Sequence, residues 1–65
     1  MPTITVKGMS CEHCKQAVTR ALEAIPGVGA VTVDLATGAA SWTETQPVAY
    51  SVIENVIKKI GFEVQ

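Results

Sequence analysis

Two stretches of this chain repeat the same spacing of apolar residues, and this repetition restricts the fold more than any other feature. In each stretch, apolar residues recur at positions i, i+3, i+4, i+7, i+8 and i+11, which places them on one side of an α-helix. The first set is Cys14, Ala17, Val18, Ala21, Leu22 and Ile25, and the second is Ala49, Val52, Ile53, Val56, Ile57 and Ile60. The sequence therefore predicts two amphipathic helices whose apolar sides are buried in a shared core.

Residues that end or begin helices bound both predicted segments. The first helix spans roughly residues 12–25, because Pro26 and Gly27 follow it directly. The second begins after Pro47, since proline suits the first turn of a helix, and it ends near Gly61.

Short segments that alternate polar and apolar residues flank the helices and predict β-strands. These segments are TITV at 3–6, VTVDL at 31–35, AASWT at 39–43 and FEV at 62–64. The intervening ATG makes a turn, so the second and third strands form a hairpin. This order of elements predicts an α+β fold, a ferredoxin-like βαββαβ sandwich with a four-stranded antiparallel sheet and two helices on one face.

Length, charge and hydropathy exclude several classes of protein. Sixty-five residues make a single domain, and the net charge of −1 lacks the basic excess of a nucleic-acid binder. The N-terminal MPTITVKGMS has neither the positive nor the apolar region of a secretory signal. No apolar run approaches the roughly 20 residues of a transmembrane helix. We expect one domain over residues 1–65, located in the cytoplasm, with no nucleic-acid partner and no direct membrane insertion.

Both cysteines lie in GMSCEHC, residues 8–14, where the first strand leads into the first helix. Cys11 precedes the predicted helix and Cys14 falls in its first turn, where the helix dipole favours a thiolate. Two such sulfurs suit Cu(I), Hg(II), Zn(II) or Cd(II). A structural zinc site uses four ligands, and the chain has one CxxC and one His, so zinc alone is disfavoured while Cu(I) and Hg(II) both fit.

A metal held by only two sulfurs leaves room for an incoming thiolate, so this site favours transfer by ligand exchange. We do not expect an enzyme, because no base, second nucleophile or substrate pocket accompanies the thiols. A CxxC at a helix N-terminus also occurs in thiol–disulfide oxidoreductases. That alternative is less favoured because Glu12 and His13 replace a Pro-containing dipeptide and the chain is too short for a thioredoxin-like fold.

The chain resembles the heavy-metal-associated domain family, whose signature Gly-Met-(Thr/Ser)-Cys-x-x-Cys matches residues 8–14 position for position. The likeness continues through IPGV, VTVDLATG and IKKIGFEV and so covers the whole chain. It implies a copper chaperone that binds one Cu(I) through Cys11 and Cys14 and delivers it to the metal-binding domain of a copper-transporting P-type ATPase. It also allows a mercury- or zinc-binding module, a domain excised from an ATPase or reductase, and a metal-bridged homodimer.

The resemblance further implies roles for three residues near the cysteines. Met9 would be buried beneath the loop without binding metal. Ser10 stands where zinc-transporting members often carry Asp, which favours the copper type. Phe62 stands where bacterial copper chaperones often carry Tyr, so an apolar ring can cover the site but no phenolic hydroxyl is available.

We expect ordinary structural positions for His13 and Trp42. His13 lies off the apolar side of the helix, so we expect an exposed side chain. The alternative is a ligand in a metal-bridged dimer or a weak, pH-sensitive third ligand. Trp42 is expected to lie in the core, packed against the sheet.

The topology also predicts that three connections meet at one end of the molecule: the loop at 8–14, the turn at 36–38 and the segment 58–62. Four of the five basic residues fall near that end, while the acidic residues look scattered. These four are Lys7, Lys15, Lys58 and Lys59. Lysines in a last helical turn stabilise the helix dipole. Equally, Lys58 and Lys59 could form a cationic rim that steers docking to an acidic partner.

Overall fold

The computed structural model describes residues 2–65 and has the predicted order of elements. In chain order these are β1 (Thr3–Lys7), α1 (Glu12–Glu23), β2 (Val28–Asp34), β3 (Ala39–Glu44), α2 (Tyr50–Lys59) and β4 (Glu63–Val64). The first helix ends at Glu23, slightly before the predicted limit, and β2 begins at Val28, slightly before the predicted start. Neither helix in the described part of the chain is long and apolar enough to span a membrane.

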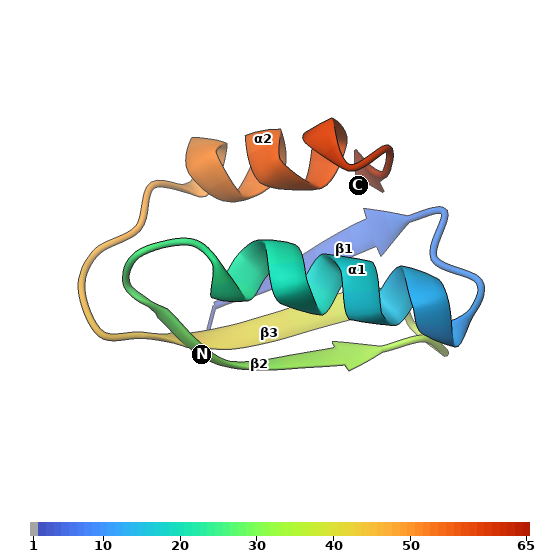
Figure 1. Ribbon diagram of the computed structural model, residues 1–65, viewed down its shortest axis with the longest axis horizontal. Helices are drawn as coiled ribbons and strands as arrows, with labels where there is room; N and C mark the ends of the chain where they lie inside the picture. The colour runs from blue at the N-terminus through green and yellow to red at the C-terminus, as the bar shows by residue number, and fades with distance from the viewer. Residues whose placement is uncertain (1) are drawn as a thin grey trace.

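The strands form one antiparallel sheet in the order β2-β3-β1-β4, and both helices lie on the same face of it (Figure 1). In the register of this sheet, Ala40 of β3 lies between Ile4 of β1 and Val33 of β2. All three side chains are buried, so the register places one apolar row beneath the helices. The predicted ferredoxin-like α+β fold is confirmed.

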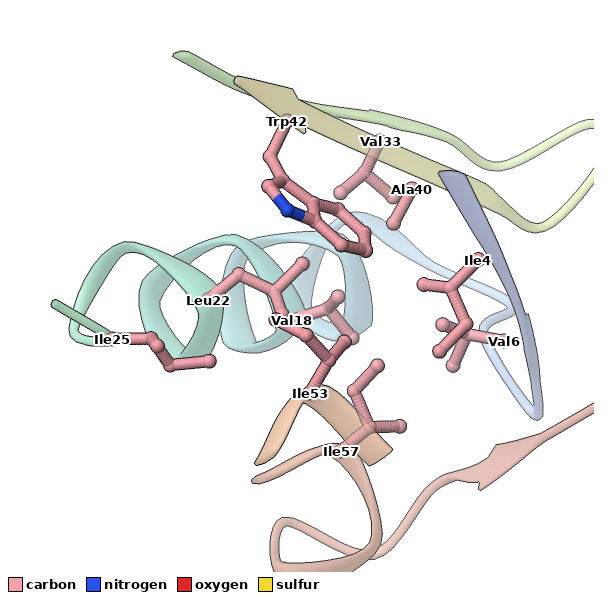
Figure 2. Packing of buried hydrophobic residues seen from close by; sticks show 10 residues of the cluster. All are labelled: Ile4, Val6, Val18, Leu22, Ile25, Val33, Ala40, Trp42, Ile53 and Ile57. Atoms are coloured by element: carbon pink, nitrogen blue, oxygen red, sulfur yellow. The ribbon is translucent and has the colours of Figure 1, made fainter. Parts of the chain in front are cut away.

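The core lies between the sheet and the two helices. Its buried members are Ile4, Val6, Val18, Leu22, Ile25, Val33, Ala40, Trp42, Ile53 and Ile57. Figure 2 shows Trp42 extending from β3 toward Leu22, with Ile53 on the other side of Leu22. Trp42 is only 2% exposed, which confirms its predicted place in the core.

The apolar side of α2 is narrower than its sequence pattern predicts. Ile53 and Ile57 are fully buried, but Ala49 is exposed, and Val52 and Ile60 keep 41% and 39% of their surface exposed. The prediction that these three residues belong to the core is therefore wrong. Ala49 and Ile60 are the N-cap and C-cap residues and lie immediately outside the ten-residue helix. Val52 lies within the helix, at the border of its buried side.

The three connections predicted to meet at one end do so, at the right of Figure 1. The backbone N–H of Val6 donates to the carbonyl oxygen of Gly38 at 2.8 Å, which holds the β2–β3 turn against the end of β1. Gly38 has a φ of 76°, and a Cβ there would lie 2.9 Å from the Val6 oxygen. Only glycine fits both constraints. Gly38 therefore holds the β2–β3 turn in place at the end of the molecule that carries the cysteines.

The N-terminus of α2 lacks a side-chain cap, which gives a test of this helix boundary. The N-cap residue is Ala49, with extended backbone and no acidic residue in the following turn. We expect Ala49→Ser to raise the free energy of unfolding by about 1 kcal/mol, because its hydroxyl can accept from the N–H of Ser51. Urea unfolding followed by Trp42 fluorescence measures this change. Ala24→Ser, at the exposed C-terminal cap of α1, is the matched control and should be nearly neutral; an equal effect of both would contradict the boundary.

Candidate metal centre

Both cysteines are positioned by the N-terminus of α1. Cys11 is the N-cap residue, with φ −152° and ψ 170°, and its carbonyl oxygen accepts the first helical hydrogen bond from the N–H of Lys15. Cys14 is the third residue of the helix and is half-buried, whereas Cys11 is exposed. The backbone N–H groups of the first turn have no partners within the helix, so this turn presents partial positive charge to both sulfurs.

The two sulfur atoms lie side by side as free thiols. The Sγ atoms of Cys11 and Cys14 are 3.3 Å apart, within hydrogen-bond contact. With metal–sulfur bonds of about 2.3 Å, this separation would give a sulfur–metal–sulfur angle of roughly 90°. A near-linear pair needs sulfurs about 4.6 Å apart. Because Cys11 is exposed and precedes the helix, its side chain is the one that can swing outward to open the angle.

The pKa of the Cys14 thiol is lowered from its ordinary value by the loop that precedes it. The main cause is a hydrogen bond from the Ser10 backbone, followed by the hydrogen bond from the Cys11 thiol. Partial burial of Cys14 acts in the opposite direction and is outweighed. Cys14 is therefore available as a thiolate for a metal at a lower pH than an isolated cysteine. The sequence could not indicate this role of Ser10, because every residue but proline carries a backbone N–H.

An aromatic ring and a glycine define the other side of the loop. Gly8 has a φ of 95°, and a Cβ built on it would lie 3.4 Å from Cδ1 of Phe62. Phe62 is half-buried and packs against the core, so its ring lies beside the start of the loop. Met9 also packs against the core but is only half-buried, so the prediction that it is buried is wrong in degree. The hydrophobic contacts of both residues anchor the loop to the fold.

The remaining predicted site residues lie at the surface. Ser10 is exposed, and so is His13, as expected from its place off the apolar side of α1. Within residues 2–65, no three or more His, Cys, Asp and Glu side chains come together in a group that could hold a metal ion. His13 therefore does not join Cys11 and Cys14 in such a group.

The cysteine end of the molecule carries charges of both signs. Lys58 and Lys59 are exposed in the last turn of α2, and Lys7 ends β1. Glu12 is the first residue of α1, and Glu63 pairs with Lys7 in the register of β1 and β4. The acidic residues are scattered along the chain, as expected, and two of them lie at this end. Basic and acidic side chains therefore share this end of the molecule.

Comparison with known proteins gives consistent matches over nearly the whole chain. Residues 3–63 match the model of the heavy-metal-associated domain. The copper chaperone CopZ of Staphylococcus aureus is 40% identical over 62 residues, which cover 94% of this chain and 91% of that protein. A solved CopZ metallochaperone is 38% identical with a TM-score of 0.90, over 98% of this chain and 97% of that one. A copper binding domain from HMA7, a P-type ATPase, is 30% identical with a TM-score of 0.86, over 97% and 86%.

The position of Cys11 gives a prediction about stability in the metal-free protein. Cys11 occupies the N-cap without making a side-chain capping bond. Cys11→Ser supplies an oxygen that can accept from a first-turn N–H, and we expect it to raise the free energy of unfolding by roughly 0.5–1 kcal/mol. Cys14→Ser, inside the first turn, is the matched control and should give no such gain. Urea unfolding of both metal-free variants measures the difference, and equal stabilities would contradict the capping argument.

The lowered pKa of Cys14 gives a prediction about pH. In Cys11→Ala, where Cys14 is the sole thiol, the rate of alkylation by iodoacetamide should reach half its maximum at a lower pH in the folded protein than in urea. Because the folded pKa lies below the unfolded one, deprotonation of Cys14 favours folding. Its contribution is complete above the unfolded pKa and is lost as the pH falls through the folded pKa. Identical midpoints in both states would exclude the hydrogen bond from Ser10 as a cause.

Proposed function

This chain belongs to the heavy-metal-associated domain family, and from that premise we propose that it is a cytoplasmic copper chaperone. It binds one Cu(I) between Cys11 and Cys14 and transfers it to the metal-binding domain of a copper-transporting P-type ATPase. The observation that carries the proposal is the pair of free thiols 3.3 Å apart at the start of α1. The likeness to the copper chaperone CopZ and to a copper binding domain of a P-type ATPase supports both the cargo and the partner.

Transfer follows from the low number of ligands. A thiolate of the partner attacks the Cu(I) held by two sulfurs and forms a three-coordinate bridge. One sulfur of this chain then leaves, and a second thiolate of the partner replaces the other. Exposed Cys11, at the N-cap, is suited to leave first, while Cys14 is held by the helix and by its hydrogen bond from Ser10. No covalent bond of a substrate is made or broken, so we propose a carrier without enzymatic activity.

A cytoplasmic location agrees with the chemistry of the site. The proposed ligands are effective only as thiols or thiolates, and a reducing compartment keeps them in that form. A homodimer bridged by one Cu(I) is a further state that exposed Cys11 allows, with exposed His13 as an additional ligand.

Anaerobic competition titration tests the cargo directly. We expect one Cu(I) per chain when the metal is offered against a chromophoric Cu(I) chelator. Binding should be lost in Cys11→Ser and in Cys14→Ser, because either change leaves a single sulfur. Parallel titrations with Zn(II) and Hg(II) decide between copper and the alternative mercury- or zinc-binding module. Stoichiometric Cu(I) binding that survives both substitutions would rule out the proposed site.

Charge reversal tests whether α2 guides the partner. We expect Lys59→Glu to slow Cu(I) transfer to a purified metal-binding domain of a copper-transporting P-type ATPase by about tenfold at low salt, because electrostatic steering is lost. The effect should shrink at high salt. Arg20→Glu is the matched control, since it makes the same charge change in the last turn of α1, away from the thiols. Stopped-flow measurement at two salt concentrations checks this; equal slowing by both variants would contradict local steering.

A further inference from the structure

We propose that a β-bulge at Ala30 keeps the free edge of β2 from pairing with a second copy of this chain. β2 is an edge strand of the sheet, and one extra residue interrupts its pairing with β3. Ala30 and Val31 together lie opposite the single residue Trp42, between the paired stretches 28–29 and 32–34. Ala30 is exposed and takes a φ of 48°, a conformation that strains an alanine but not a glycine.

The core does not need this extra residue. The residues of β2 that belong to the core or pack against it are Val28, Val31 and Val33. Without Ala30 the strand would read Val-Gly-Val-Thr-Val-Asp, which still has an apolar residue at every second place. The same valines would therefore face the helices in a regular ladder with β3. The bulge must be explained by something other than the packing of β2 side chains.

The outer side of β2 presents backbone donors and acceptors to solvent. On the β1 side of β3, the N–H of Trp42 donates to the carbonyl oxygen of Pro2 at 3.2 Å. Successive residues of an antiparallel strand direct their backbone groups to opposite sides, so those of Ser41 face its partner Thr32 in β2. The backbone groups of Val33, the next residue of β2, therefore face away from the sheet. An edge of this kind is a template for another strand.

The bulge divides that edge into pieces too short to act as a template. Regular pairing with β3 covers residues 28–29 before it and 32–34 after it, and the extra residue puts these two stretches out of step. Without Ala30, the remaining residues of β2 would form one uninterrupted strand.

A second copy of the chain is the partner that such a strand would capture. Two β2 edges can pair antiparallel about a two-fold axis, so that each supplies the backbone partners of the other. The opposite edge of the sheet is less exposed to this reaction, because β4 has only two residues, Glu63 and Val64. One edge is thus protected by its shortness, and the other, β2, by its bulge.

Deletion of Ala30 tests the proposal on metal-free, reduced protein, in which the cysteines cannot link two chains. Sedimentation equilibrium should show the unchanged chain as a monomer of 6.8 kDa and the deletion variant as a reversible dimer. Hydrogen exchange at the amide of Val33 should slow about tenfold once about nine-tenths of the variant is dimeric, because only the monomer exchanges there. Ala30→Gly is the matched control: it relieves the strained φ, keeps the extra residue and should remain monomeric.

Each other outcome would overturn the proposal. A folded deletion variant that stays monomeric, or that dimerises without slower exchange at Val33, would show that the bulge does not guard this edge. Equal association of Ala30→Gly would assign the effect to relief of strain instead of loss of the extra residue. A deletion variant that no longer buries Trp42, seen as a red shift of its fluorescence, would show that the fold itself requires Ala30. None of these results bears on Cu(I) binding by the cysteines.

Discussion

The packing of both helices onto one face of the sheet determines where everything else in this molecule lies. Val18 and Leu22 of α1 and Ile53 and Ile57 of α2 are fully buried against the strands, and this contact fixes the direction of each helix. With those directions set, the loop before α1, the turn after β2 and the segment after α2 must meet at one end. A core this small thus serves mainly to hold one loop and one helix start in place.

At that helix start, a cysteine occupies the position of a capping side chain. The best residues for an N-cap are Ser, Thr, Asp and Asn, yet Cys11 occupies the position and makes no capping bond. The same backbone that leaves the N–H groups of the first turn free directs their positive ends toward the sulfurs. The hydrogen bond from the Ser10 backbone to Cys14 adds to this effect and lowers the pKa of the thiol. The helix start therefore lacks a side-chain cap, while its surroundings favour a thiolate at Cys14.

The sequence predicted the elements, their order and the cysteine pair well, because these depend on local patterns. Helix periodicity and strand alternation specify the element types, and Pro26 with Gly27 marks the end of α1. The outer members of the α2 pattern could not be placed in the same way. Val52 and Ile60 have the spacing of core residues, but their burial depends on how far neighbouring elements extend over them. Met9 differs from prediction for the same reason.

Features of the site that depend on backbone contacts were beyond sequence reasoning. The 3.3 Å between the sulfurs and the hydrogen bond from Ser10 arise from the path of the loop. The ring of Phe62 beside Gly8, in contrast, agrees with the predicted meeting of segment 58–62 and the loop at 8–14. Ala30 is a further feature that the sequence does not reveal, with a φ of 48° at the irregularity in β2 between Gly29 and Thr32. Nothing about an alanine predicts a left-handed conformation; pairing on either side of the bulge imposes it.

The proposed two-sulfur site is accessible from solvent through Cys11. This accessibility affects both the release of a bound metal and the entry of competing ions. In the proposed function, a partner thiolate can reach a metal held by Cys11 and Cys14 because Cys11 lies at the surface. Any other soft ion, and any small disulfide, has the same access, since the ligand set itself discriminates little among them. Selectivity must therefore come from what surrounds the chain: the metals that are available, the redox state of the thiol pool and the fit of a partner to this end of the molecule. A carrier that rejected every competing ion through its own ligands would need a fully coordinated, closed metal site. Such a site would not release its metal ion to a partner.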